Sequence, residues 1–591
     1  MANREPIQYI EIDVDYCANT YATLPCTAVL NVNSVRKCFN TYGTCQAKST
    51  YIKSVKTLRF INNRSNLPKD LNAYPALDEG GVSAFSSTVN IAGGDPRMTA
   101  FGRRATVSVN LMDFVDDDID IDKYVSQRIS GAAQFSAIGY KPIDFGTFFT
   151  RLKARWPHYA GRPLRIIDGF IDDGILTVDQ TRNFIITDFK GPSDRGKVTI
   201  EAKDVLALAD DKKALAPKPS RGKAATAVTA AAGQTFSLIP SGVGVEYPAS
   251  GSATMGSEVV TYTRSVDVVT LVTRGENGTV AASHSINDSF QEALVFSAKR
   301  VDDAIYDLLT IYAKVPVAFC PLVLEWQPEI TKWMGSVLLD TVITKPTGVA
   351  QLLGELADLG ISIWWDDVAQ KVKILANHPV QNESIVNISD LDNIKAIVQE
   401  DKSEDRISQV HFYHKQTDPT KDYKDKSNYN QINVLIDTDA ESVNAYGDTK
   451  VREVFCRYLN NGADSTVRTL ALRLLKRFNT PPINYTITLD IQDRGLKLAG
   501  VLRINSRVVT DETGIPLQKL LQVFRQEEVK SGHEIKVSAQ DFNYNGRYGT
   551  IMANGTLTYP SATPAQKLNG SYFVNGTTLL FSDGATPYLF I

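Results

Sequence analysis

The sequence has no apolar stretch that approaches the roughly 20 residues needed to cross a bilayer as a helix. The longest apolar run, residues 315–324, is short and contains Pro316 and Pro321. The N-terminus, Met-Ala-Asn-Arg-Glu-Pro, lacks the apolar core of a signal peptide, so we expect synthesis in a reducing cytoplasm. In that compartment cysteines are more often thiols or metal ligands than disulfides.

The sequence also has no excess of either charge. Its 63 Lys and Arg residues and 66 Asp and Glu residues give a net charge of −3. This balance gives no reason to expect specific binding to nucleic acid or to an anionic membrane. The 591 residues are 43% hydrophobic and 22% charged, which is enough for roughly three to five domains with cores of their own.

Motifs of known catalytic chemistry are missing as well. The chain has neither a Gly-x-Ser-x-Gly nucleophile elbow nor a His-Glu-x-x-His zinc motif. Of the six histidines, only His411 and His414 lie close in the sequence, and on a strand they would point to opposite faces. We therefore expect a protein that is not an enzyme.

Two stretches resemble ligand-binding loops only in part. Residues 191–198 differ from a P-loop at Val198, where a Ser or Thr would hold magnesium. A strand pattern follows them, so we expect a turn between two strands. Residues 113–122 contain six aspartates but lack the Gly and Glu of an EF-hand loop, and we expect a charged strand end in solvent.

Cysteine is concentrated near the N-terminus. Cys17, Cys26, Cys38 and Cys45 have the spacing C-x8-C-x11-C-x6-C, and the other two cysteines stand alone as expected buried thiols. The residues between the four are turn formers and small polar groups, which would let the chain wrap around a centre. The spacing alone leaves four alternatives open: an iron–sulfur cluster, a structural zinc, two disulfides or four unrelated thiols.

Alternation of apolar and polar residues predicts a chain that is mainly β. After a linker rich in Ala and Lys at residues 211–233, short strands indicate a compact β insert. The strands expected on this pattern are residues 106–111, 164–171, 184–189, 198–202, 258–263, 268–273, 293–296, 361–365, 372–375, 483–489, 518–528 and 535–540.

Helical periodicity is confined to a few segments. Residues 301–312 carry apolar side chains at the spacing of one helix face. Residues 349–359 end at Gly360, and residues 465–478 end before a Pro-Pro pair. Residues 146–152 could form a further short helix.

Several motifs together resemble those of siphophage tail proteins. The four cysteines, followed by Lys-Thr-Leu-Arg-Phe at residues 56–60, resemble the cysteine segment of the minor tail protein L family of lambda-like phages. Residues 101–113 and 146–155 resemble the opening of phage baseplate hub proteins. Gly256-Ser-Glu-Val-Val-Thr-Tyr262, Arg274-Gly-Glu-Asn-Gly-Thr279 and His284 resemble a small β module inserted in many tail proteins.

The resemblance implies a fold and a cofactor. It implies a multidomain, mainly β protein with barrel or sandwich hub domains, a few packed helices and a small N-terminal iron–sulfur loop segment. Cys17, Cys26, Cys38 and Cys45 would ligate one [4Fe–4S] cluster, with structural zinc as the alternative. The expected divisions are a cluster-binding segment at 1–54, a β-rich hub domain at 55–215, a linker and inserted β module at 216–300, an α+β hub domain at 301–540 and a C-terminal β extension at 541–591.

The resemblance also implies a role. The protein would be a homotrimer at the virion tail tip, synthesised and assembled in the host cytoplasm, that closes the tail tube. Its partners would be the distal tail protein, the tape measure protein and other hub and receptor-binding tail proteins. It would have no membrane span and no specific nucleic-acid binding, although phage DNA would pass through the assembled hub. The competing expectation is a tail-associated hydrolase acting on cell wall or surface polysaccharide.

Overall fold

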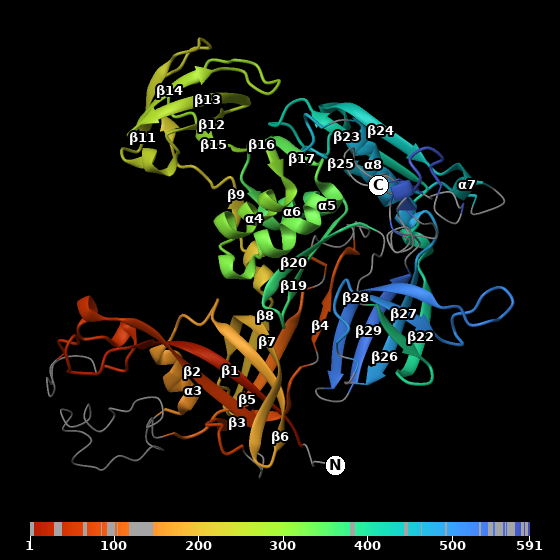
Figure 1. The fold of residues 1–591 in the computed structure, drawn as a ribbon. Coiled ribbons are helices and arrows are strands. Elements are labelled where there is room, and N and C mark those ends of the chain that lie inside the picture. The colour runs from red at the N-terminus through yellow and green to blue at the C-terminus, as the bar shows by residue number, and fades with distance from the viewer. Residues whose placement is uncertain are drawn as a thin grey trace.

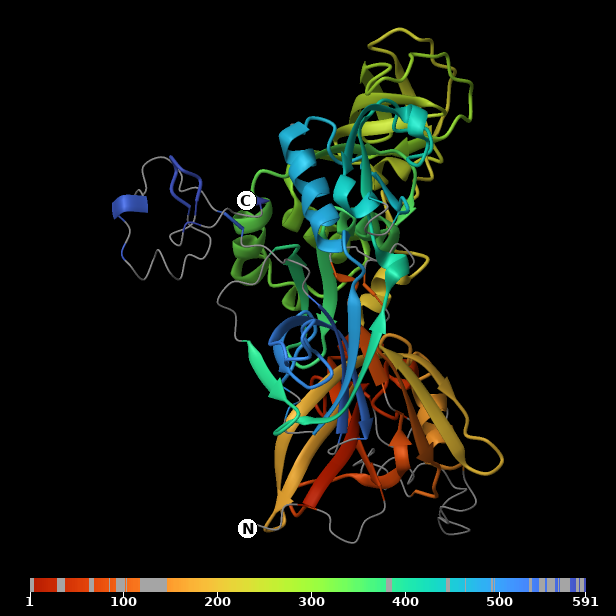
Figure 2. The ribbon, with the colours of Figure 1, turned by 90° about the vertical axis from the view of Figure 1, so that its right-hand side faces the viewer.

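The computed structural model describes residues 5–28, 38–62, 68–83, 85–91, 101–102, 104–116, 146–378, 385–442, 447–462, 464–490, 493, 495–530, 534–541 and short stretches between 548 and 590 (Figure 1). A closed barrel and a second large sheet lie at one end of the molecule, and the inserted β module lies at the other (Figures 1 and 2). Helices and small sheets fill the space between them.

The barrel forms because its strands alternate inward apolar and outward polar residues. Strand β5 pairs with β8 so that Val109 faces Ile200 and Leu111 faces Val198, all buried. Helix α3 (Phe148–Arg155) adds Phe148 to the barrel core. The strand order around the barrel is β1 (Glu5–Cys17), β2 (Lys53–Asn62), β3 (Tyr74–Val82), β5 (Thr106–Met112), β8 (Lys197–Lys203), β7 (Ile175–Lys190) and β6 (Pro163–Asp172), with β6 pairing back to β1.

The inserted module is a six-stranded sheet with its own apolar core around Tyr262 and Phe290. Its strand order is β10 (Lys223–Ala224), β11 (Thr235–Ile239), β14 (Val268–Thr273), β13 (Glu258–Ser265), β12 (Ser250–Met255) and β15 (Phe290–Glu292).

The middle of the molecule contains the largest apolar core. The helical stripe expected at residues 301–312 is confirmed: Val301, Ile305 and Leu308 are fully buried, and α4 continues as a π-helical turn at Leu308–Tyr312. The elements of this part are β16 (Leu294–Arg300), β17 (Leu338–Ile343), β9 (Leu215–Ala216), β18 (Thr347–Gly348), α4 (Val301–Asp307), a second π-helical turn (Leu322–Trp326), α5 (Gln327–Met334), α6 (Val349–Ala357), β19 (Ile361–Asp366) and β20 (Lys371–Ala376).

Two further sheets complete the described chain. Helix α8 (Asp464–Phe478) packs on a three-stranded sheet of order β24 (Tyr429–Ile436), β23 (Gln409–Gln416) and β25 (Val451–Phe455), with α7 (Thr438–Glu441) following β24. The second large sheet has the order β21 (Val386–Ser389), β27 (Val501–Asn505), β28 (Lys519–Lys530), β29 (Glu534–Asp541), β26 (Ile483–Asp490) and β22 (Ile394–Asp401), and β4 (Phe85–Thr88) also pairs with β28. Near the C-terminus β30 (Tyr548–Gly549) pairs with β31 (Leu589–Phe590).

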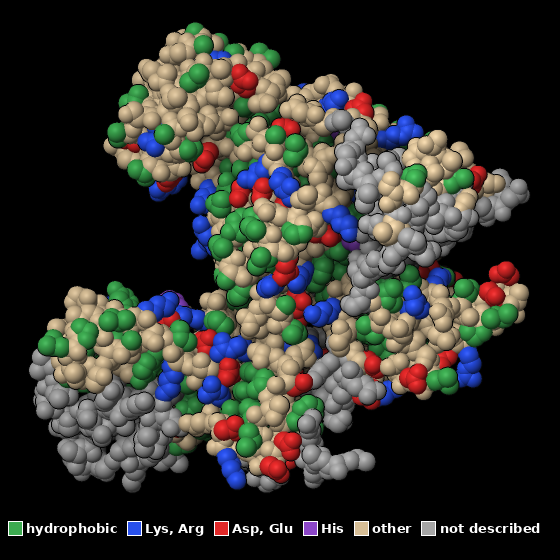
Figure 3. Space-filling model, viewed as in Figure 1, with side chains coloured by type: hydrophobic (Ala, Val, Ile, Leu, Met, Phe, Trp, Pro, Cys, Tyr) green, Lys and Arg blue, Asp and Glu red, His purple; other side chains and the backbone are tan. Residues whose placement is uncertain are grey.

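The expectation of a multidomain, mainly β protein with barrel-like sheets and few helices is confirmed. The expected helices at 349–359 and 465–478 are α6 and α8, while α5, which has a proline in its first turn, was not predicted. Lys and Arg side chains are mixed with Asp and Glu side chains over the surface in view (Figure 3). No helix in the described part of the chain is both long and apolar enough to span a membrane.

Candidate functional site

The four clustered cysteines occupy different local structures. Cys17 is the last residue of β1, is paired with Lys53 of β2, and is buried. Cys38 is also buried, whereas Cys26 and Cys45 are half-buried. Burial raises the pKa of the Cys45 thiol, and the charges of Cys17 and Cys26 raise it further. All four are free thiols.

The cofactor expectation is wrong. Among the described residues, which include Cys17, Cys26, Cys38 and Cys45, no three His, Cys, Asp or Glu side chains are grouped so as to hold a metal ion. This finding contradicts the expected [4Fe–4S] cluster and the alternative structural zinc, and the described residues show no iron–sulfur loop segment. The four cysteines do not share one loop, because Cys17 ends strand β1 and pairs with β2, whereas Cys45 follows a 3-10 turn at Tyr42–Thr44.

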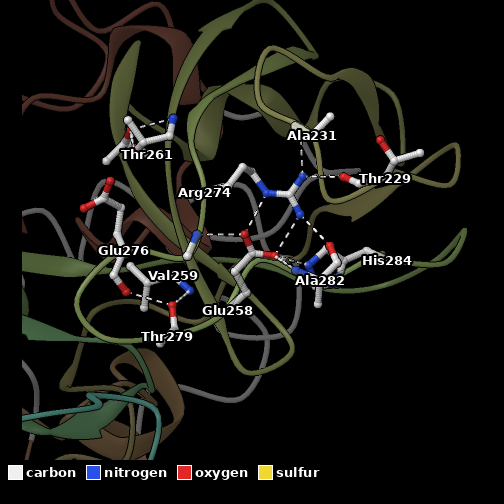
Figure 4. A network of polar contacts seen from close by, with 12 residues as sticks. Thr229, Ala231, Glu258, Val259, Thr261, Arg274, Glu276, Thr279, Ala282 and His284 are labelled. Atoms are coloured by element: carbon white, nitrogen blue, oxygen red, sulfur yellow. Dashed lines mark hydrogen bonds and ion pairs between the residues drawn. The ribbon is translucent and has the colours of Figure 1, made fainter.

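A buried carboxylate is the centre of the densest polar network in the inserted module (Figure 4). Glu258, at the start of β13, is 1% exposed and accepts hydrogen bonds from Arg274 Nε at 2.7 Å and Arg274 Nη2 at 2.8 Å. It also accepts from the backbone N–H groups of Gly275 and Ala282, both at 3.0 Å, and from His284 Nε2 at 2.8 Å. Five donors therefore converge on one carboxylate.

These contacts keep Glu258 ionised. Burial raises its pKa, but Arg274, the Ala282 N–H and His284 outweigh that effect and hold the pKa at about 2. Arg274 in turn donates to the carbonyls of Thr229, Ala231 and Ala282. Glu, His and Arg are common catalytic residues, but each side chain here is nearly fully buried and bound to its neighbours. The arrangement can hold loops together; it offers no accessible base or nucleophile.

The turn after Arg274 places the module against the middle of the molecule. Asn277 and Gly278 both have positive φ, the backbone conformation that favours Asn-Gly in tight turns. A Cβ at Gly278 would lie 2.1 Å from the carbonyl oxygen of Thr417, so only glycine allows this close approach.

The two partial ligand-binding loops are structural. Residues 191–198 form the predicted turn between β7 and β8, closed by a hydrogen bond from the Ser193 N–H to the Lys197 carbonyl at 2.9 Å. In the acidic stretch, Asp113 accepts from the Phe149 N–H at 3.0 Å and so caps α3. Residues 117–122 of that stretch lie outside the described residues.

A second polar cluster joins the barrel to the second large sheet. Arg182 of β7 forms an ion pair with Glu528 of β28, and the two side chains are 5% and 6% exposed. Arg182 Nη1 also lies 3.8 Å from the Asp367 carboxylate, in the turn between β19 and β20. Burial raises the pKa of Asp367, and the Arg182 charge lowers it. We call these three side chains the junction cluster.

Main-chain contacts surround the junction cluster. Strand β4, which precedes the barrel strand β5 in the chain, pairs antiparallel with residues 525–528 of β28. The Asn183 side-chain amide donates to the Asp367 carbonyl at 3.1 Å, and Trp365 Nε1 donates to the Asn183 carbonyl at 3.3 Å. No sequence signal indicates this cluster, because Arg182 and Glu528 are 346 residues apart and no local motif connects them.

Comparison with known proteins gives only distant likeness. No family model matches the chain, and no curated protein matches it by sequence. Solved structures similar to it include the tail protein from Neisseria meningitidis MC58, with 10% identity, a TM-score of 0.35 and coverage of 78% of this chain and 91% of that chain. Two others are the prophage MuSo2 43 kDa tail protein from Shewanella oneidensis (12% identity, TM-score 0.32, coverage 78% and 96%) and the prophage tail protein gp18 from Listeria monocytogenes EGD-e (8% identity, TM-score 0.33, coverage 82% and 91%). TM-scores of this size do not establish a shared fold.

Proposed function

We propose that this protein is a structural component of a bacteriophage tail tip or baseplate hub. In this role it closes the tail tube as a homotrimer and anchors the tape measure protein, the distal tail protein and receptor-binding components. It acts in attachment and genome delivery and is located at the virion tail tip. The sequence motifs that resemble hub proteins and the inserted tail module support this assignment.

The observation that carries the proposal is the junction between the barrel and the second sheet. Domains joined only by a chain segment move relative to one another by default. Here β4 hydrogen-bonds across the junction to β28, and the buried pair of Arg182 and Glu528 joins the same two bodies. Two bodies that are joined in this way suit a protein that must keep its shape when force acts on the tail. This role needs no catalytic group.

The test is to locate the chain in assembled particles. Antibody against the inserted module, detected by immunogold electron microscopy, is expected to label the distal end of the tail, with pre-immune serum as the control. Light scattering on the detergent-released tail-tip complex is expected to give a multiple of three copies. Label on the capsid, or absence of the chain from purified particles, overturns the proposal.

The hydrolase alternative has a separate test. Zymography of the purified full chain on cell-wall and polysaccharide gels is expected to give no clearing band. A clearing band that comigrates with the chain would replace the structural role with a hydrolytic one.

A further inference from the structure

A cavity of about 230 Å³ opens beside the junction cluster and is not used by the proposed structural role. Four separate segments line it: β7, the β19–β20 hairpin, the β4–β28 pair and the loop that precedes β27. Pockets for drug-sized ligands have about 300–1,000 Å³, so this cavity suits a smaller ligand or one terminal unit of a larger one.

One wall of the cavity is aromatic and rigid. Trp364 of β19 lines the cavity and also packs against a small apolar cluster that contains Val89 and Ala499. The ring is therefore held by neighbours from the second sheet and does not need to be ordered by a ligand. An indole ring at a cavity wall offers an apolar face together with one N–H donor.

The other walls of the cavity carry both uncharged polar and charged side chains. Ser87 and Gln526 face each other across the β4–β28 ladder and both line the cavity, so they lie on the same face of the sheet. Five charged side chains also line the cavity: Asp179, Asp366, Asp367, Arg182 and Lys497. The side chains of Ser87, Gln526, Lys497 and Trp364 make no hydrogen bond to any other residue that the structure describes.

This combination selects a class of ligand. A simple cation would be disfavoured by the cationic side chains of Arg182 and Lys497. A simple anion would be disfavoured by the three aspartates that line the same cavity. A polyhydroxy ring can hydrogen-bond to both the cationic and the anionic side chains, because each hydroxyl donates one hydrogen bond and accepts others. Its C–H face stacks on an aromatic ring.

The geometry points to a saccharide-binding site in this cavity, which takes one neutral pyranose ring stacked on Trp364 and hydrogen-bonded to Ser87 and Gln526. The ring is a free sugar or the end unit of a glycan chain. The site binds and does not hydrolyse, so it adds recognition of a glycan to the proposed structural role.

Saturation-transfer difference NMR on the full chain tests the site with three probes: methyl α-D-glucopyranoside, methyl α-D-galactopyranoside and N-acetyl-D-glucosamine. At least one is expected to receive saturation, with a dissociation constant in the millimolar range because the ligand is small. Spermidine, run as a cationic probe, is expected to receive none. Lack of transfer to all three sugars overturns the proposal, and binding of spermidine alone would make the cavity a cation site.

Two variants separate the cavity from other surfaces. Gln526→Ala is expected to weaken binding about five- to tenfold, the worth of one hydrogen bond. Trp364→Phe keeps an aromatic ring in the apolar cluster but loses the N–H and part of the stacking area, with a similar expected loss. The matched controls are Asp188→Asn, on β7 outside the cavity, and Trp333→Phe, whose ring stacks on His378.

If Trp364→Phe does not fold, Gln526→Ala and Ser87→Ala decide the test. Unchanged binding in these two variants places the sugar elsewhere and overturns the assignment. Loss of binding in either control to the same degree has the same consequence.

Discussion

Removal of the Glu258 charge is expected to loosen the inserted module selectively. Glu258→Gln keeps the size of the side chain but ends the ion pair with Arg274 and turns an N–H group toward at least one of five donors. Taking one partner from a buried pair costs about 3–5 kcal/mol. A pKa held at about 2 instead of an ordinary 4.5 corresponds to about 3 kcal/mol, in agreement with the lower end.

Hydrogen exchange followed by mass spectrometry measures this loss where it occurs. A loss of about 3 kcal/mol in the opening free energy corresponds to an acceleration of about 150-fold for core amides of β13 and β14. The matched control is Glu276→Gln, which makes the same charge change in the turn after Arg274 without touching the Arg274 side chain and is expected to leave exchange unchanged. Equal rates in the two variants would refute the network as a source of stability.

The same prediction has a dependence on pH. The pKa of Glu258 is lower in the folded chain than in the unfolded chain, so its contribution is complete above about pH 4.5. It is lost as the pH falls toward about 2. The difference in exchange between the wild type and Glu258→Gln is therefore expected to shrink through this window, and a difference that grows on acidification would contradict the assignment.

Three further predictions concern other parts of the chain. Arg182→Met leaves the buried carboxylate of Glu528 without its guanidinium partner and is expected to lower the stability of the junction by about 3–5 kcal/mol. The loss is measured as faster hydrogen exchange of β4 and β28 amides, with partial recovery when Glu528 is also replaced by an apolar residue. Gly278→Ala is expected to displace the module and speed tryptic cleavage of its preceding linker, whereas Gly514→Ala, also at positive φ but in open space, is expected to leave that cleavage unchanged. Burial raises the pKa of Cys320 and of Cys456 to about 12, so both are expected to react with a thiol reagent only after denaturation, and fast reaction in the folded chain would contradict their burial.

Single helices and strands could be predicted because the sequence pattern that indicates each one lies within the element itself. The stripe of Val301, Ile305 and Leu308 predicted a buried helix face, and all three are fully buried in the largest core. The alternation around Val109 predicted a half-buried strand, which is β5 of the barrel. In both cases the period of the sequence is the period of the backbone, so no knowledge of distant residues is required.

The candidate site could not be predicted in the same way. The spacing of Cys17, Cys26, Cys38 and Cys45 gives the number of thiols but not the directions in which they point. That spacing left four alternatives open, and only the resemblance implied a metal centre. The described side chains do not form one, and strand pairing fixes Cys17 at the end of β1. The junction cluster could not be predicted for a different reason. Arg182 of β7 and Glu528 of β28 are 346 residues apart and meet only in the tertiary fold, and single-sequence periodicity carries no information on such contacts.

The residues of the inserted module that resemble a tail-protein module have a structural role. Glu258, Arg274 and His284 are chemically able to form an active site, yet each is bound to fixed partners in the interior. Asn277 and Gly278 serve the turn that meets Thr417. A motif made of one buried carboxylate, its donors and one docking turn specifies how a small module folds and attaches, and so it is informative about architecture. Activity has to be argued from side chains whose hydrogen-bonding groups remain open to a ligand, and in the described chain those of Ser87, Trp364 and Gln526 meet that condition together in one cavity.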